Sequence, residues 1–350
     1  MKYIRMFFIL LFVALYTASC NDGAGVIGDF PSSGGTPSVT PPGVPADEDV
    51  LQDGYPASVA LYRFTDWFDA ESKCVGWYAI VDVSSSSDVE FNAVHELSPG
   101  KTPEGVFAEM KFQGKTPYIV TNGGYFYNGE SLSLCINDGK VESIAAQMTW
   151  PDGKEVYPVR AALGMFEDGR FEATWVYCPS DGGMKPYSYP SPLDNDESIG
   201  TFMDKMPSAS YDGAVLWAPE EAIGGGPMLV LEGKNVSNDY YYKEVLDAGG
   251  TAGKSRQPRT AIASTEDGKV ILLVCDGRKM NDSKGYTLAE LADKLISLGA
   301  VNAVNLDGGG SSAIVGKDGK VLNRPSDSGS GTSVKMRQVP TALVISAKER

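Results

Sequence analysis

Short apolar runs, rich in β-branched and aromatic residues and closed by turn signals, recur along the chain and most strongly constrain its fold. Dipeptides such as Asp267-Gly268 are typical of the tight turns that join strands. Apolar runs of this length predict strands rather than helices. We therefore expect a β-rich domain of mixed α+β class, with curved mixed sheets and few helices. The runs lie at 75–83, 117–122, 171–177, 269–276 and 339–346.

Two segments carry helical signals. In 287–299, Thr287 and Glu290 have the spacing of a capping box, and leucines form one apolar stripe along the segment. In 103–113, Thr102 precedes a proline at the first turn, where proline is favoured. Both segments are therefore predicted to be helices.

The helix at 287–299 lies between the strands expected at 269–276 and 301–306. This order predicts a βαβ-like unit near the C-terminus, in which two neighbouring strands are parallel and the crossover is right-handed. Ligands of such units bind beyond the carboxyl ends of the strands. Because Asp276 and Asp307 stand at those two ends, we expect both carboxylates to face one crevice.

The composition excludes several classes of protein. The chain has 350 residues and a formal net charge of −15, with 30 Lys and Arg against 45 Asp and Glu. A field of that sign repels nucleic acid, so no nucleic-acid partner is expected. The single histidine, His95, excludes sites that need two, such as most zinc hydrolase sites.

The N-terminal 50 residues are predicted to be a targeting signal followed by a spacer. Residues 1–19 form a basic start and an apolar run that is too short to span a bilayer, as in a signal peptide. Small residues before Cys20 resemble the lipobox of bacterial lipoproteins, although Thr17 departs from that pattern. We expect lipidation at Cys20, export, and anchoring to the membrane of the bacterial cell envelope. Residues 20–50, acidic and rich in Gly, Pro and Ser, predict a flexible linker to a domain at 51–350.

Four further cysteines fit no metal-binding spacing. In an exported protein they either form two disulfides, by any of three pairings, or remain buried thiols. The sequence leaves this open. They are Cys74, Cys135, Cys178 and Cys275.

Glycine clusters joined to polar residues mark a candidate binding site. They lie at 121–126, 224–230 and 306–312. Two further segments, 258–263 and 275–278, carry polar residues at the ends of expected strands. Glycine lets a ligand approach the backbone amides, and arginine binds phosphate oxygens bidentately. The candidate binding residues are Asn122, Gly123, Gly124, Arg259, Thr260, Arg278, Gly308, Gly309, Gly310, Ser311, Ser312 and Arg337, with Arg160 as a weaker one.

Two common site types are absent from the sequence. The segment 308–312 lacks the lysine of a phosphate-binding loop. No Gly-x-Ser-x-Gly elbow of a serine hydrolase occurs. Nucleotide binding and serine hydrolysis are therefore disfavoured.

The order of the motifs is specific. Asn-Gly-Gly-Tyr-Phe, Gly-Gly-Gly-Pro-Met-Leu-Val, Pro-Arg-Thr-Ala-Ile-Ala, Asp-Gly-Arg, Leu-Asp-Gly-Gly-Gly-Ser-Ser and a late Arg-Gln-Val-Pro follow one another. This series resembles the phosphodiester glycosidase family over residues 117–346, and 51–116 is taken as the N-terminal β-rich part of the same domain. The resemblance implies hydrolysis of a sugar 1-phosphodiester with release of the sugar. We expect the substrate to belong to exopolysaccharide or cell-surface glycans.

Under this resemblance Asp307 and Asp276 are the catalytic candidates, since a carboxylate stabilises an oxocarbenium-like transition state. No cofactor is expected; a divalent cation such as Ca²⁺ is the weaker alternative. Two rival functions remain: a non-catalytic surface glycan-binding lipoprotein, and a phosphodiesterase that cleaves the P–O bond. The sugar, the aglycone, the stereochemical outcome and the oligomeric state stay open.

Overall fold

The structure, a computed structural model, describes residues 47–84, 86–96, 98–145, 147–149, 153–247 and 250–348. The expected leader, Cys20 and nearly all of the expected linker lie outside the described residues. Among the helices of the described part, none combines the length and apolar character needed to cross a membrane.

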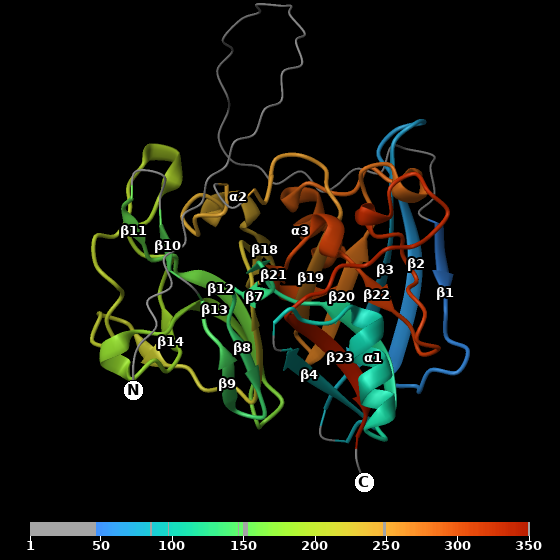
Figure 1. Cartoon of the computed structure of the whole chain (residues 1–350), viewed down its shortest axis with the longest axis horizontal. Helices are drawn as coiled ribbons and strands as arrows, with labels where there is room; N and C mark the ends of the chain where they lie inside the picture. Colours follow the sequence, from blue (N-terminus) through green and yellow to red (C-terminus); the bar gives the residue numbers. More distant parts are fainter. Residues whose placement is uncertain are drawn as a thin grey trace, which may run out of the picture.

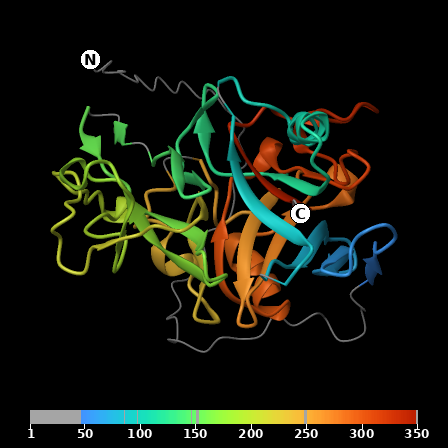
Figure 2. The same ribbon diagram turned by 90° about the horizontal axis from the view of Figure 1, so that it is seen from below.

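The largest sheet has eight strands and brings together distant parts of the chain (Figures 1 and 2). Of its three N-terminal strands, β3 pairs with β20, which is followed across the sheet by β19 and β21. The order is β1 (Asp47–Val50), β2 (Val59–Trp67), β3 (Lys73–Asp82), β20 (Lys269–Cys275), β19 (Arg259–Thr265), β21 (Ala300–Asn305), β17 (Met228–Leu231) and β18 (Lys234–Asn235).

The expected strand–helix–strand unit is present in modified form. Strand β19 is antiparallel to both β20 and β21, so those two strands are parallel to each other as predicted. They are not neighbours, however, because β19 lies between them. The prediction of adjacent strands was wrong because β19 and β20 form a hairpin through the turn at 266–268, a pairing that the pattern from 269 onward does not contain.

A four-stranded sheet places the C-terminal strand in its interior. Strand β23 (Thr341–Ala347) pairs antiparallel with β5 (Pro117–Asn122) on one side and β4 (Val89–His95) on the other. Strand β22 (Ile314–Val315) completes the sheet beside β5. Since β2, β3 and β4 precede residue 116, the N-terminal part and the motif-bearing part share two sheets.

A seven-stranded sheet forms the other half of the molecule, on the left in Figure 1. Two hairpins lie outside these sheets, β6 (Phe126–Tyr127) with β7 (Glu130–Ser131) and β10 (Met148–Thr149) with β11 (Glu155–Val156). The order in the seven-stranded sheet is β15 (Val215–Leu216), β14 (Tyr187–Tyr189), β13 (Phe171–Tyr177), β12 (Arg160–Met165), β16 (Glu221–Gly224), β8 (Cys135–Asn137) and β9 (Lys140–Ser143).

The main core lies where the three sheets face one another. Leu272 from the eight-stranded sheet, Leu343 from the four-stranded sheet and Leu163 from the seven-stranded sheet belong to one cluster, and each is at most 1% exposed. Burial of such side chains contributes roughly 1.5–3 kcal/mol each. The sheets are therefore held together by one shared apolar interior.

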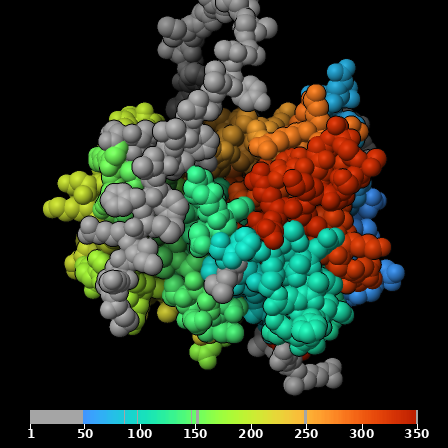
Figure 3. Space-filling view, in the orientation of Figure 1, coloured from blue at the N-terminus to red at the C-terminus, as the bar shows by residue number. Residues whose placement is uncertain are grey.

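The two predicted helices are confirmed. Helix α3 (Leu288–Ser297) begins with the capping box of Thr287 and Glu290, and its leucines pack on the eight-stranded sheet. Helix α1 (Pro103–Phe112) is capped by the Thr102 hydroxyl and packs on the four-stranded sheet. The C-terminal segment lies beside α1 on the face shown in Figure 3. A short helix, α2 (Ser237–Tyr240), is the remaining α-helix of the described part.

Five single 3-10 turns complete the secondary structure of the described residues. The one at Gly309–Ser311 belongs to the turn after β21. The others are Ser180–Gly182, Glu197–Ile199, Met280–Asp282 and Ser326–Ser328.

The four cysteines of the domain are free and buried, which selects the thiol alternative in this structure. Burial raises the pKa of the Cys178 thiol to about 12, so the neutral form predominates. These cysteines contribute as small apolar groups to the core.

Candidate active site

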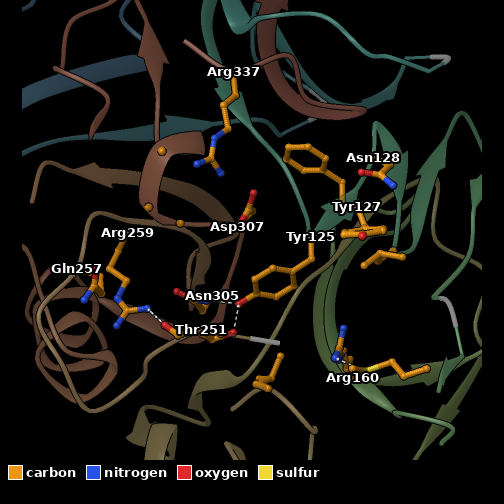
Figure 4. Close-up of a pocket in the computed structure, with 18 of the residues that line it drawn as sticks. Tyr125, Tyr127, Asn128, Arg160, Thr251, Gln257, Arg259, Asn305, Asp307 and Arg337 are labelled. Carbon is orange, nitrogen blue, oxygen red and sulfur yellow. Dashed lines mark hydrogen bonds between the residues drawn. The ribbon is translucent and has the colours of Figure 1, made fainter. Parts of the chain in front are cut away.

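A cavity of about 500 Å³ lies where the three sheets meet. Its lining comes from the segment after β5, the start of β12, the loop before β19, and the segments after β20 and β21. The Arg337 side chain enters from the loop before β23 (Figure 4). Elements from all three sheets therefore supply the lining.

The lining is unusually rich in arginine. Arg160, Arg259, Arg278 and Arg337 all border the cavity, whereas Asp307 is the one carboxylate among the lining residues of the described chain. In a protein of formal net charge −15, such a local excess of positive charge favours an anionic ligand. The cavity therefore fits a negatively charged substrate that meets a single carboxylate.

Asp307 is held in place by its own backbone. Its N–H donates to the Gly123 carbonyl (3.1 Å), and its carbonyl accepts from the Asn122 side-chain amide (2.7 Å). Burial raises the pKa of the Asp307 carboxyl to about 6, and a hydrogen bond from Ser311 and the positive charge of Arg337 partly oppose that rise. The carboxylate form still predominates at neutral pH, as a nucleophile or base requires.

The glycine turn after Asp307 lets two arginines approach it closely. A side chain at Gly310 would collide with the ion pair of Asp327 and Arg337. Gly309 has φ +62°, and Arg278 packs against it. The absence of side chains on this turn thus brings both guanidinium groups to the neighbourhood of Asp307.

The two arginines keep donors for a ligand. Arg337 binds both Asp327 oxygens through Nε (2.6 Å) and Nη2 (3.1 Å), which fixes its orientation. Arg278 donates from Nε to the Gln257 side chain (2.9 Å). Each of these guanidinium groups has five N–H donors, so several remain for phosphate oxygens.

Several predicted ligand-binding residues instead form hydrogen bonds within the protein that support the glycine turn at 308–310. The Asn122 Oδ1 accepts from the Thr260 hydroxyl (2.8 Å) and from the Ala313 amide (3.2 Å). The Thr260 hydroxyl also lies 3.3 Å from the Ser312 hydroxyl. All three predicted residues are at most 1% exposed, and none lines the cavity. These three residues therefore hold the glycine turn in position and do not face the cavity.

Gly123 and Gly124 are likewise part of the frame. The amide of Gly123 donates to the Thr341 carbonyl (2.8 Å), and the amide of Gly124 donates to the Thr341 hydroxyl (3.0 Å). These bonds tie the segment after β5 to β23. Neither glycine lines the cavity, whereas Gly308, Gly309 and Gly310 do.

Arg259 lines the cavity but has most of its donors in use. Its Nε donates to the Tyr286 carbonyl (3.0 Å) and its Nη1 to the Thr251 carbonyl (2.9 Å). Its Nη2 donates to the carbonyls of Ala252 and Ser255, both at 3.0 Å. The residue is 2% exposed. Arg259 therefore mainly holds the loop before β19 in place, and few of its N–H donors remain for a ligand.

The expectation that Asp276 and Asp307 face one crevice is not met. Asp276 is 1% exposed and does not line the cavity. Its Oδ1 accepts from the Asn323 side chain (3.1 Å) and the Arg324 amide (2.9 Å), and its Oδ2 accepts from the Asn281 side chain (2.7 Å). The separation follows from the insertion of β19 between the two strands. Burial raises the pKa of Asp276 to about 6.

Asp276 is nevertheless connected to the segment after the glycine turn by hydrogen bonds through Asn323. The Asn323 side-chain amide that donates to Asp276 also donates to the Ser312 carbonyl (2.9 Å), and the Asn323 Oδ1 accepts from the Ile314 amide (3.0 Å). Asp276 therefore acts as a positioning residue for the segment that follows Asp307.

Replacing Asp276 by alanine is expected to lower the free energy of unfolding by about 2–4 kcal/mol, because three donors lose their acceptor. We expect turnover to fall by at most about 100-fold, the size of a misplacement effect. Denaturant unfolding and steady-state kinetics measure the two quantities. A larger fall in turnover with unchanged stability would return Asp276 to direct catalysis.

The Tyr125 side chain lines the cavity. Its hydroxyl donates to the Gly226 carbonyl (2.7 Å) and accepts from the Asn305 side chain (2.8 Å). Burial raises the pKa of Tyr125 to about 12, so the phenol stays neutral. The aromatic ring can pack against a sugar ring.

Sequence reasoning missed four side chains that shape the site. Asp327 orients Arg337, and Asn323 joins Asp276 to the turn. Asn305 holds the Tyr125 hydroxyl, and Glu244 anchors β12 and β17. The Leu-Asn-Arg-Pro sequence at 322–325 offers only a turn signal, and Glu244 has no local motif. Their partners are distant in sequence, so no local signal was available.

In the part of the chain that the structure describes, no cluster of three or more His, Cys, Asp or Glu residues suits a metal ion. The lining carries one carboxylate and four arginines. A site of that charge does not fit a divalent cation, which prefers several oxygen ligands.

The fold and the cavity define a β-rich protein with one ionisable carboxylate beside arginines, a site suited to an anionic glycoside. The family model described as phosphodiester glycosidase matches residues 105–346. The chain belongs to the phosphodiester glycosidase family.

Relatives with known names and solved structures agree with this assignment. Mouse N-acetylglucosamine-1-phosphodiester alpha-N-acetylglucosaminidase is 36% identical over 214 residues, which cover 60% of this chain and 33% of that protein. The chain spans a third or less of the length of the curated relatives it matches.

Two solved structures share the fold. The catalytic domain of the zebrafish enzyme of the same name has a TM-score of 0.55 at 20% identity, covering 88% of this chain and 89% of that one. A hypothetical protein from Synechocystis has a TM-score of 0.56 at 18% identity, covering 88% and 64%. At these identities the likeness concerns the fold alone.

Proposed function

We propose that this protein is a hydrolase that cleaves the glycosidic C–O bond of a sugar 1-phosphodiester and releases the sugar. The observation that carries this proposal is the meeting of Asp307, the one lining carboxylate of the described chain, with Arg278 and Arg337 in one cavity. Membership of the phosphodiester glycosidase family supports the same reaction class. Exopolysaccharide or other cell-surface glycans are the proposed source of the substrate.

In this proposal the charged groups have distinct tasks. Arg278 and Arg337 hold the phosphodiester through charge-assisted hydrogen bonds. The ionised Asp307 then stabilises the positive charge that develops at the anomeric carbon, either as nucleophile or as base for water. The C1–O bond breaks, its electron pair leaves with the phosphate, and water supplies the new hydroxyl group.

The leaving group explains why one carboxylate suffices. A phosphate monoester departs as a stable anion, so it needs less help from a general acid than an alcohol does. The arginines also stabilise the negative charge that collects on the departing oxygen. The proposal therefore requires no second catalytic acid and no histidine.

We also propose that the protein is exported and anchored to the cell envelope through a lipidated Cys20. The apolar run before Cys20 and the acidic, Gly- and Pro-rich segment at 20–50 support this placement. A linker of that composition would let the domain reach surface glycans.

Hydrolysis in ¹⁸O-water tests the reaction. With a simple alkyl diester of N-acetylglucosamine 1-phosphate, we expect the label in the released sugar, because the C–O bond breaks and water attacks carbon. Mass spectrometry of both products measures the label, and a reaction in ordinary water is the control. Label in the phosphate would support a phosphodiesterase, and glycan binding without turnover of any sugar 1-phosphodiester would support a non-catalytic binder.

A further inference from the structure

Arg160 is a buried arginine whose donors are only partly used. It opens β12 and is 8% exposed. Its Nε donates to the Glu244 carbonyl (3.1 Å), and its Nη2 donates to the Val245 carbonyl (2.8 Å) and to the Met148 sulfur (3.2 Å). These bonds fix the guanidinium plane. Within the described residues, the Arg160 Nη1 has no hydrogen-bond partner.

The unused nitrogen is not sealed inside the core. Among fully buried side-chain nitrogens and oxygens of the described chain, only Asn92 Oδ1 and Asn305 Oδ1 lack a partner. The Arg160 Nη1 also lacks one, so it is not fully enclosed. Since Arg160 lines the cavity, Nη1 offers its two N–H groups to whatever the cavity binds.

Within the described part of the chain Arg160 forms no direct ion pair, although the charge of Glu244 acts on it. The hydrogen bonds of the Glu244 carboxylate go to other partners, since it accepts from the Trp175 indole (2.9 Å) and the amides of Met228 (2.8 Å) and Ala161 (2.9 Å). Glu197 acts on Arg160 only at longer range. A buried positive charge that has carbonyl, sulfur and aromatic partners but no direct contact with a carboxylate favours an anionic ligand.

Arg160 lies apart from the phosphate-binding arginines. In Figure 4, Tyr125 stands between Arg160 on one side and Asp307 with Arg337 on the other. The guanidinium carbon of Arg160 is 5.9 Å from the centre of the Tyr125 ring. A sugar packed on Tyr125, with its anomeric phosphate near Arg337, would direct its far edge toward Arg160.

We propose that Arg160 recognises a second anionic group, carried by the sugar itself, so that the substrate class is the 1-phosphodiesters of acidic sugars. This inference rests on the proposed function, because the anomeric phosphate sets the position of the sugar. The second anion is either a carboxylate, as in a uronic acid, or a phosphate ester on the sugar. Both groups can accept a charge-assisted hydrogen bond from the Arg160 Nη1.

Binding of three probes tests the proposal without requiring turnover. The probes are glucose 1-phosphate, glucuronic acid 1-phosphate and glucose 1,6-bisphosphate, which differ only at carbon 6. Titration calorimetry on the purified full chain is expected to show about tenfold tighter binding of at least one acidic probe, the effect of one charge-assisted contact. The acidic probe that binds more tightly identifies the second anion as carboxylate or phosphate.

Three variants separate recognition from support. Arg160→Met is expected to abolish the preference, so that the affinities for the acidic and the neutral probes become about equal, and Arg160→Lys is expected to keep part of it. Arg170→Met, which removes an exposed arginine, controls for loss of one positive charge. Thermal unfolding checks that all variants fold.

The proposal is overturned if the wild type binds the three probes equally, if it binds none, or if Arg160→Met weakens all probes by the same factor. The last result would assign Arg160 to the frame or to the anomeric phosphate. The proposed function is judged separately, by turnover of neutral and acidic sugar 1-phosphodiesters. Absence of turnover with a retained Arg160-dependent preference would overturn that function alone.

Discussion

Replacing Asp307 by asparagine is expected to reduce turnover of a sugar 1-phosphodiester by roughly 10³-fold or more, with little change in KM. The amide cannot act as nucleophile or base, whereas the arginines that bind the phosphate remain. Steady-state kinetics on the diester measures the effect. Asp318→Asn, which makes the same change at an exposed turn, should leave turnover unchanged.

The pH dependence of activity tests the role of the Asp307 carboxylate independently. Burial raises the pKa of Asp307 to about 6, so the reactive carboxylate becomes scarce below that pH. The wild-type kcat/KM should therefore fall about tenfold for each pH unit below 6 and level off above it. Unchanged activity in Asp307→Asn, or a rate that rises as the pH falls below 6, would remove Asp307 from the role of nucleophile or base.

Replacing Glu244 by alanine is expected to lower the free energy of unfolding by about 3 kcal/mol or more. Glu244 is fully buried and accepts hydrogen bonds from Trp175, Met228 and Ala161. All three donors would lose their acceptor in the interior, where water does not replace it. The melting temperature should fall by about 5 °C or more, as expected for a domain of this size.

Differential scanning calorimetry measures this loss. Glu266→Ala, at an exposed position of the β19–β20 turn, is the matched control and should unfold as the wild type does. Glu244→Gln should fall between the two, because it retains one oxygen and turns an N–H toward existing donors. A wild-type melting temperature in Glu244→Ala would show that Glu244 does not anchor β12 and β17.

The elements of the fold were predictable where the signal was local. The helix at 287–299 was identified because its cap, its leucine stripe and its terminal glycine lie within one segment, and the structure confirms it. The strands at 117–122 and 269–276 followed from continuous apolar runs and match β5 and β20. The placement of β19 between β20 and β21 did not follow, because strand order depends on which edges pair.

The candidate site divides in the same way. The motifs located the correct neighbourhood, since Asp307, Arg278, Arg337 and the three glycines line one cavity. They did not distinguish a side chain that faces the cavity from one that supports it. Asn122, Thr260 and Ser312 stand in those motifs, yet their donors and acceptors are used within the protein.

The sequence alone determined the two longer helices, the strands with the strongest apolar runs, the glycine turn after Asp307 and the family resemblance. Propensity, capping and glycine chemistry act over a few neighbouring residues, and each can be recognised from one segment. Only the tertiary structure decided that Asp276 turns away from the cavity toward Asn323 while Arg160, at the start of a distant strand, enters it. Burial and hydrogen-bond partners depend on contacts between residues far apart in the chain, so the role of a charged side chain is set by the packing around it.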